Sequence, residues 1–291
     1  MNPIQTAFGT LFGNLQDSEQ LDSLSEILKL PVADILRLPN DPRVTYRPFT
    51  IKKRRGGERS ISAPSGYLKK LQRSLLHNYL HSLPIHPLAY AYRRGNSIAS
   101  HAKQHLNQQI VLSVDLADFF LNTTTRRVRH FYAAHGWQDE ALRVLVRLST
   151  FRGGLPQGAP TSPVLSNLVN FDMDTAMHEL AMINGAQYSR YADDLAFSWA
   201  SRHSEPKSFR SSVENIFERY GYQVQAEKGW KQQRASETPE LTGIAIDGNR
   251  LLPRKEVRRE RRRLRWKLFK SRADLARLAG LDGFVNQLRR R

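Results

Sequence analysis

The spacing of apolar residues predicts two helices in the first third of the chain. Positions 21–30 carry an apolar stripe at helical spacing, which Pro31 ends, and positions 65–83 continue the same period for longer. Between them, residues 46–64 read as two short strands around the Gly56-Gly57 turn. The positions expected to face inward are Leu21, Leu24, Ile27 and Leu28 in the first helix, and Leu68, Leu71, Leu75, Tyr79 and Leu83 in the second.

The middle of the chain changes to a β pattern. "IVLSVDLADFF" (110–120) is a continuous apolar run, which predicts a buried strand that includes Phe120. Two helical stretches follow, and then "FRGGLPQGAPTSP" (151–163), which is too rich in Gly and Pro to be anything but a loop. Ser162, as a cap followed by Pro163, predicts a helix from there to about Ile183.

The last third mixes short strands with helices. The pattern predicts a hairpin around "YADD" (191–194), a helix over 206–220 closed by Gly221, and a strand near 222–226. A small hairpin over 241–252 is expected to turn at Asp247-Gly248. Strands and helices alternate without a strict βαβ rhythm, so the predicted fold class is α+β around an antiparallel sheet.

Charge narrows the class of partner. The 291 residues hold 45 Lys and Arg against 27 Asp and Glu, a net charge of +18. The excess is concentrated, because residues 250–291 carry 16 basic and four acidic residues while residues 1–40 carry two and five. A basic surface that serves only solubility would not be so uneven. The favoured partner is therefore a polyanion, most simply nucleic acid.

Two absences in the sequence bear on location. There is no cysteine, so disulfides and thiolate metal sites are excluded, which fits a reducing compartment. No apolar run approaches membrane-spanning length, and the first residues lack the pattern of a signal peptide. We expect a cytoplasmic protein without a membrane partner.

The adjacent carboxylates Asp193 and Asp194 are the strongest chemical signal. Like charges on neighbouring side chains oppose each other's ionisation unless a cation lies between them. If the strand that carries Asp115 lies beside this hairpin, three hard oxygen donors converge, and these suit Mg²⁺ rather than zinc. Two such ions stabilise the attacking and leaving oxygens of a phosphoryl displacement. Taken alone, however, an Asp-Asp hairpin is usually a plain polar turn.

Several motifs together resemble reverse transcriptases. "VDLADFF", "LPQGAPTSPVLSN" and "YADD", in this order and at these separations, resemble the palm motifs of that family. "KKRRGGERSISAP" is similar to its fingers motif, "GYQVQAEK" to the segment after the palm, and "LTGIAIDGNRLLPR" to the Val-Thr-Gly region of bacterial retron enzymes. The likeness covers roughly residues 44–288 and is closest to the retron type. The retron signature Asn-Ala-x-x-His reads "HAKQH" here, with His101 in place of Asn.

The resemblance implies a right-hand polymerase and a set of roles. We expect an N-terminal helical segment over 1–43, fingers over 44–109, a palm over 110–240, and a hairpin with a short helical thumb over 241–291. Asp115, Asp193 and Asp194 are the implied catalytic ligands of two Mg²⁺ ions, for which Mn²⁺ can substitute. Lys228, which composition alone suggests is a solvated surface lysine, is the implied proton donor to the departing pyrophosphate.

The same resemblance implies a nucleotide site. Lys53 and Arg59, which flank the Gly-Gly turn, suit the triphosphate of a deoxynucleotide, although an ordinary basic hairpin would read the same. Gln157 and Gly158 match the family's loop beneath the nucleotide sugar and the template base. Phe120, five residues after Asp115, matches the aromatic gate that excludes a ribose 2′-hydroxyl.

Two further segments are candidates for RNA contact. His101 and His105 stand four apart, but Ala102 occupies the position where a metalloprotease helix has Glu and no third ligand follows, so a zinc site is rejected. We expect their helix to pack or to contact RNA. The run 254–270 carries ten Lys and Arg and a narrow stripe of Val257, Leu264 and Leu268. Its predicted RNA-binding residues, where the alternative is a solvated basic helix, are Arg254, Arg258, Arg261, Arg262 and Arg265.

The sequence thus predicts an RNA-directed DNA polymerase. The retron resemblance implies a structured non-coding RNA that serves as template and primer, a branched RNA–DNA product (msDNA), and antiphage defence with a separately encoded effector protein. One alternative is another defence-associated or CRISPR-associated reverse transcriptase. The other, from a different class, is an RNA-binding scaffold that restrains a toxic effector.

Overall fold

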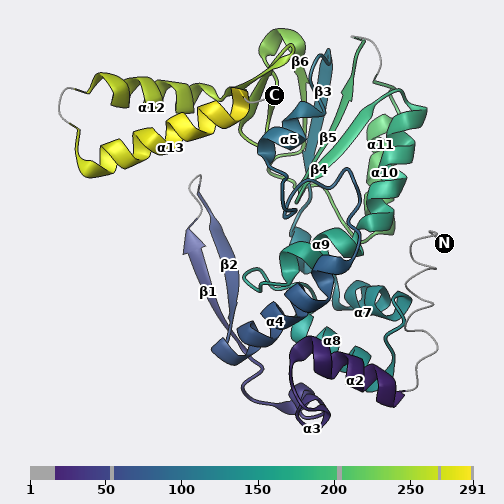
Figure 1. The fold of residues 1–291 in the computed structure, drawn as a ribbon. Coiled ribbons are helices and arrows are strands. Elements are labelled where there is room, and N and C mark those ends of the chain that lie inside the picture. Colours follow the sequence, from purple (N-terminus) through teal and green to yellow (C-terminus); the bar gives the residue numbers. More distant parts are fainter. Residues whose placement is uncertain (1–16, 53–55, 202–204, 268–269, 290–291) are drawn as a thin grey trace. The chain divides into compact units, whose positions relative to one another are not determined.

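A computed structural model describes residues 17–52, 56–201, 205–267 and 270–289. The chain divides into two compact units and passes between them more than once. The first unit comprises residues up to His86 together with Asp118–Asp172, and the second comprises Pro87–Ala117 together with Met173 onwards. Figure 1 shows the elements of each unit. In the described ranges, no helix is long and apolar enough to cross a membrane.

The first unit is mainly helical. Its core is formed by the apolar stripes of several amphipathic helices, and Leu24, Leu71 and Leu145 are fully or almost fully buried there. A hydrogen bond of 2.8 Å from the indole of buried Trp137 to the Tyr79 hydroxyl satisfies two polar groups in that interior. The helices are α2 (Asp17–Leu28), α3 (Val32–Ile35), α4 (Gly66–Asn78), α6 (Phe119–Asn122), α7 (Thr125–Ala134), α8 (Asp139–Ser149) and α9 (Ser162–Val169), with short 3-10 turns at Leu38–Asn40 and Leu80–Ser82.

One hairpin extends from this helical core. Strands β1 (Tyr46–Lys52) and β2 (Glu58–Pro64) pair antiparallel in the register Tyr46↔Pro64 to Lys52↔Glu58. Tyr46 is buried at the base, whereas Phe49 and Ile51 are each 44% exposed along the arm. The hairpin predicted around Gly56-Gly57 is therefore confirmed.

The second unit contains a four-stranded antiparallel sheet in the order β4-β5-β3-β6. The strands are β3 (Ile110–Asp115), β4 (Gln187–Tyr191), β5 (Asp194–Trp199) and β6 (Trp230–Arg234). Helix α10 (Phe171–Ile183) precedes β4, and α11 (Phe209–Arg219) packs on one face of the sheet (Figure 1). There the ring centroid of Phe209 lies 5.0 Å from those of both Phe197 and Trp199. Strand alternation directs Val111 and Ala196 to the opposite face, against α5 (Ile98–Lys103).

A smaller sheet and a helical hairpin complete this unit. Strands β7 (Glu240–Leu241), β8 (Ile244–Asp247) and β9 (Arg250–Pro253) are antiparallel, and a short 3-10 turn at Ala235–Glu237 precedes them. Helices α12 (Lys255–Trp266) and α13 (Arg272–Arg289) follow and lie side by side in Figure 1. Ion pairs join them, because Asp282 of α13 accepts from Arg261 at 2.5 Å and from Arg265 at 3.0 Å.

Two predicted elements are shorter in the structure. The strand predicted over 110–120 ends at Asp115, because Asp118 adopts a left-handed conformation (φ 42°) and Phe119 opens a short helix instead. The helix predicted over 162–183 is two helices, separated where the Asn170 side chain donates to the Ser166 carbonyl at 2.7 Å. Its N-cap is Thr161 rather than Ser162.

Two other predictions are displaced along the sequence. Residues 222–226 do not form the expected strand, because their pairing to the sheet is limited to one bridge between Leu116 and Val224. The strand beside β3 is β6 instead. The small hairpin turns at Gly248-Asn249, one residue later than expected, since Asp247 still pairs with Arg250.

Candidate active site

The register of the central sheet brings two of the predicted aspartates face to face. Asp115 is the last residue of β3 and Asp194 the first residue of β5, and the two are direct antiparallel partners. Directly opposed residues point to the same face of a sheet, with Cβ atoms about 5 Å apart. Asp193 precedes them in the hairpin loop, where its carbonyl accepts the Leu116 amide at 3.0 Å. All three residues belong to the second unit.

A tight turn presents Asp193 and Asp194. Tyr191 and Asp194 pair across the hairpin, so the loop is only Ala192 and Asp193. Ala192 has a positive φ of 58° and Asp193 does not, which is the pattern of a type II′ turn. Alanine adopts that conformation less readily than glycine. The surrounding structure must therefore hold the loop in place.

A buried ion pair supports this loop. Arg190 in β4 and Asp174 in α10 are both inaccessible, and the guanidinium contacts both carboxylate oxygens at 2.7 and 2.6 Å. The Tyr188 hydroxyl donates to the same carboxylate at 2.7 Å. The remaining arginine nitrogen donates to the Ala192 carbonyl at 3.0 Å. Arg190 thus links α10 directly to the loop that carries Asp193.

Arg190 and Asp174 are not among the residues predicted from the sequence. The signal for Arg190 was present, since a charged residue within the predicted strand "YSRY" must be paired if it is buried. Its partner lies on a helix that the sequence connects only through a turn. A sequence pattern does not specify that contact.

His101 and His105 lie inside the second unit, and their assignment to RNA contact is wrong. Both are 0% exposed. The two ring nitrogens of His105 contact the hydroxyls of Ser189 (2.6 Å) in β4 and Ser198 (2.7 Å) in β5. Burial lowers the pKa of His101 to about 4 and holds the pKa of His105 well below its ordinary value. The helix packs, as the other expectation had it, and His105 joins the two strands of the hairpin behind the aspartates.

The surroundings of the three aspartates oppose the ionisation of all three carboxyl groups at once. Burial, a hydrogen bond with Asp115, and the charges of Asp115 and Asp193 raise the pKa of Asp194 to about 8. The Lys228 ammonium forms an ion pair with Asp115 Oδ1. Burial lowers the pKa of Lys228, but its hydrogen bond with Asp115 and the nearby carboxylates outweigh this and raise the pKa overall. The site therefore stabilises added positive charge.

These carboxylates fit a divalent metal ion in their chemistry. Asp115 and Asp194 present hard oxygen donors from adjacent strands. The raised pKa of Asp194 shows that its surroundings oppose its negative charge, and a bound cation would compensate that charge. Within the described part of the chain, no group of three or more His, Asp or Glu side chains is already close enough to enclose an ion. The structure thus brings Asp115 and Asp194 together, with Asp193 adjacent in the loop and Lys228 bound to Asp115.

The predicted nucleotide-binding residues lie in the first unit, apart from Lys53, which falls outside the described residues. The Gln157 carbonyl accepts the Ser62 amide of β2 at 2.8 Å, and the Leu155 amide donates to the Phe120 carbonyl at 3.0 Å. This loop therefore connects Phe120 to the strand that carries exposed Arg59. Phe120 is partly rather than fully buried, since its neighbour Phe119 takes the interior position.

Gly158 is required by the local geometry of that loop. Its φ is 128°, a conformation that side chains rarely adopt. A Cβ at this position would lie 2.9 Å from the Ser62 carbonyl oxygen. Only glycine therefore allows the loop to approach β2 this closely.

The predicted RNA-binding arginines divide into two groups. Arg258 and Arg262 are exposed on α12. Arg261 and Arg265 hold Asp282 of α13, and Arg254 lies 3.8 Å from Glu240. The first group is available to a polyanion, whereas part of the second group's charge is already compensated within the protein.

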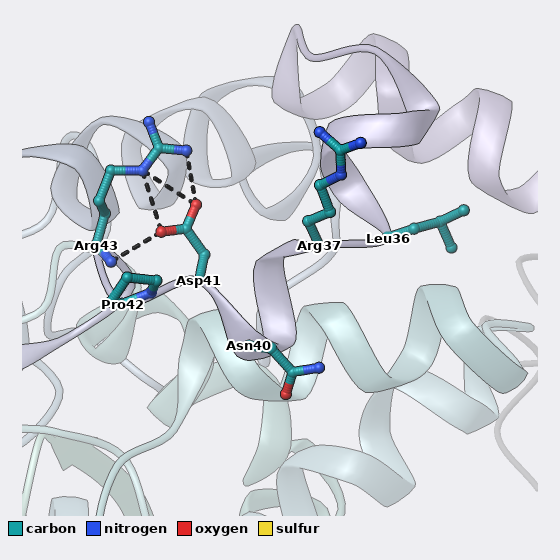
Figure 2. A pocket seen from close by; sticks show the side chains of 6 residues that line it. All are labelled: Leu36, Arg37, Asn40, Asp41, Pro42 and Arg43. Atoms are coloured by element: carbon teal, nitrogen blue, oxygen red, sulfur yellow. Dashed lines mark hydrogen bonds and ion pairs between the residues drawn. The ribbon is translucent and has the colours of Figure 1, made fainter.

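An open pocket of about 580 Å³ lies elsewhere, in the first unit (Figure 2). It is lined by Leu36, Arg37, Asn40, Asp41, Pro42 and Arg43. The guanidinium of Arg43 contacts both carboxylate oxygens of Asp41, the closer at 2.7 Å. The pocket contains none of the predicted site residues, and its carboxylate is already paired.

The chain is similar in sequence to known proteins. Residues 51–244 match the family described as reverse transcriptase (RNA-dependent DNA polymerase), and the chain belongs to that family. Within the family it is of the bacterial retron type. It is 32% identical to the retron Mx162 reverse transcriptase of Myxococcus xanthus over 80% of this chain and 54% of the relative. It is 31% identical to the retron Ec86 reverse transcriptase of Escherichia coli, with 78% of this chain and 71% of the relative covered.

The match leaves part of some relatives uncovered. The retron Mx65 reverse transcriptase of Myxococcus xanthus is 33% identical over 84% of this chain, and 61% of its length is covered. The chain thus spans between half and two thirds of the length of both Myxococcus relatives.

Proposed function

We propose that the chain is an RNA-directed DNA polymerase that extends a primer with deoxynucleotides on an RNA template. The observation that carries the proposal is the direct pairing of Asp115 with Asp194, with Asp193 next to them, inside the segment that matches the reverse transcriptase family. The basic face of α12 supports a nucleic-acid substrate, because exposed arginines there are available to phosphates.

In this proposal Asp115, Asp193 and Asp194 would hold two Mg²⁺ ions, or Mn²⁺ in their place. When bound, such ions stabilise the charge that develops on the attacking and leaving oxygens of phosphoryl transfer. A bound cation would favour the ionised form of Asp194, whose pKa is raised without one. Lys228 would donate a proton to the departing pyrophosphate; its raised pKa, which keeps it protonated, and its ion pair with Asp115 support this role.

The nucleotide and the duplex are assigned to other segments. Lys53 and Arg59 would neutralise the triphosphate, Gln157 and Gly158 would support the sugar and template base, and Phe120 would exclude a ribose 2′-hydroxyl. We assign fingers to 44–109, a palm to 110–240 and a short thumb to 241–291. The paired helices α12 and α13 support the thumb assignment, since they form one basic helical hairpin.

The retron likeness suggests the biological substrate. We infer a dedicated structured RNA as template and primer, a branched RNA–DNA product, and a role in antiphage defence with a separate effector protein. The relatives' names support this through the retron type they share. The scaffold alternative requires RNA binding but does not require the aspartates.

Primer extension tests the proposal. Purified protein is given a primed RNA template, deoxynucleotides and Mg²⁺, and DNA synthesis is measured for the wild type and for Asp193→Asn with Asp194→Asn. We expect synthesis by the wild type and none by the double variant, with RNA affinity retained in both. Equal synthesis would refute the assignment of the aspartates. Absence of synthesis from every primed template, with RNA binding intact, would favour the scaffold.

A further inference from the structure

Trp266 is the most exposed large aromatic residue in the described part of the second unit, at 82% exposure. The chain has four tryptophans. Trp137 and Trp199 are fully buried, and the indole of Trp230 donates to Glu214 at 2.6 Å. An exposed indole leaves a large apolar area in water, and such positions on a surface often mark a binding contact.

Trp266 shares one face of α12 with several cationic side chains. Lys255, Arg259, Arg262 and Trp266 follow one another at intervals of four, three and four residues, so they share one helical face. Helical rise places the two ends of this series about 16 Å apart. Arg258 and Arg263 flank the series and are exposed as well. We call these six residues the outer face of α12.

The outer face is turned away from the rest of the unit. Leu264 is buried on the opposite side of α12, and Glu260 and Arg261 of that side pair with Arg277 and Asp282 of α13. Among the ion pairs of the described residues, none involves the five cations of the outer face. These five cations thus have no ion-pair partner among the described residues, while Asp282 of α13 pairs with Arg261 and Arg265, and Asp274 pairs with Lys267 at the end of α12.

We propose that Trp266 stacks on an unpaired base of bound RNA while the cations of the outer face contact the adjoining phosphates. An indole offers a flat surface that any base can cover, and the five cations on the same helical face favour a polyanion as the partner. The base must be unpaired, because bases within a duplex are already stacked on their neighbours. This proposal rests on the proposed function, since it deepens how the thumb recognises nucleic acid.

Affinity for two matched strands tests the stacking. One probe is a short single-stranded uridine RNA, and the other is an abasic ribose-phosphate strand of equal length, which keeps the phosphates and lacks the bases. Trp266→Ala should weaken binding to the uridine strand roughly 5- to 150-fold and leave the affinity for the abasic strand unchanged. Trp266→Phe, which retains a smaller ring, should bind the uridine strand with an affinity between those of the wild type and Trp266→Ala. Arg259→Gln with Arg262→Gln should weaken binding to both strands. Ile183→Ala, at an exposed apolar position on α10, is the control that should change neither.

Tryptophan emission gives a second readout. Acrylamide is neutral, so it reaches an exposed indole without the charge effects of an anionic quencher. Saturating uridine RNA should protect the emission that Trp266→Phe removes, and the abasic strand should not. If Trp266→Ala binds both strands like the wild type, or if protection follows protein concentration without RNA, the residue contacts protein and the proposal is overturned.

The two proposals fail in different ways. Loss of base-dependent binding in Trp266→Ala, together with a wild type that makes no DNA, would support stacking and refute the polymerase. Normal primer extension with no effect of Trp266→Ala on either strand would do the reverse. Circular dichroism and thermal melting of each variant establish that α12 is still folded.

Discussion

Arg190 and Asp174 form a bidentate ion pair with no exposure to solvent, and the same guanidinium donates a hydrogen bond to the carbonyl of Ala192. The contact joins a helix to the loop that carries Asp193. Burying two charges costs several kcal/mol, which this pair offsets through close geometry and through the additional bond from Tyr188. The arrangement therefore fixes the position of the loop.

Removing one partner of this pair should strongly destabilise the second unit. Arg190→Ala leaves the Asp174 carboxylate buried without its cation, and we expect a loss of about 3–5 kcal/mol in the free energy of unfolding. Urea unfolding measures it. Arg190→Lys should recover part of the stability but not the contact with Ala192, so its DNA synthesis should stay below that of the wild type at equal folded fraction. A loss under about 1 kcal/mol for Arg190→Ala would contradict the structural role.

Replacement of the loop aspartates should separate synthesis from binding. Asp193→Asn with Asp194→Asn keeps the size of both side chains and removes the charge that metal ions require. We expect DNA synthesis to be lost while RNA affinity changes little, as measured by extension and filter binding. A matched control is Asp247→Asn, at an exposed position of the small hairpin, which should leave both unchanged.

The raised pKa of Asp194 predicts how stability depends on pH in EDTA. The folded state holds a proton on Asp194 up to about pH 8, whereas the unfolded carboxyl loses it near pH 4. Between these values the folded state binds more protons, so the free energy of unfolding should decrease as pH rises from about 4 to 8.

Asp194→Asn and added Mg²⁺ provide the two comparisons. The variant has no carboxyl to titrate, so its stability relative to the wild type should rise across the same window. Mg²⁺ should restore the wild type at pH 8 and leave the variant largely unaffected. Parallel pH profiles of the two proteins in EDTA would show that Asp194 is not the titrating group.

Phe120 is expected to control the choice of sugar. Phe120→Ala should increase ribonucleotide incorporation relative to deoxynucleotide, because a smaller residue leaves room for a 2′-hydroxyl. The ratio of the two incorporation efficiencies measures this. Phe119→Ala removes a buried neighbour and should cost about 3–5 kcal/mol in stability without changing that ratio. A ratio that is the same in Phe120→Ala and the wild type would place the selectivity elsewhere.

The two groups of arginines on α12 should differ in their effect on salt dependence. Arg258→Gln with Arg262→Gln removes exposed charges, and the slope of log affinity against log salt should flatten by roughly 0.7 to 0.9 for each phosphate that the variant no longer neutralises. Arg261→Gln with Arg265→Gln removes the partners of Asp282 and should mainly lower the melting temperature. If both pairs change the slope equally and neither changes stability, the division into two groups is wrong.

Much of the site was predictable because its parts are specified by short local sequence patterns. The strand with Asp115, the hairpin with Asp193 and Asp194, and the loop with Gly158 each have a local pattern that the structure reproduces. Burial of His105 was not predictable from its spacing, because it depends on two serines in strands more than 80 residues away. The left-handed turn at Asp118 was equally hidden in an apolar run that reads as strand.

The position of β3 in the sheet has a consequence for synthesis of the protein on the ribosome. Both neighbours of this strand, β5 and β6, come later in the sequence, at 194–199 and 230–234. At about 5 to 20 residues per second, the nascent chain carries an apolar strand with two unpaired edges for roughly 4 to 16 s before β5 emerges, and for longer before β6 does. Such a strand is prone to pair with other chains. We expect the yield of native protein to depend on translation rate and on chaperones that cover this strand.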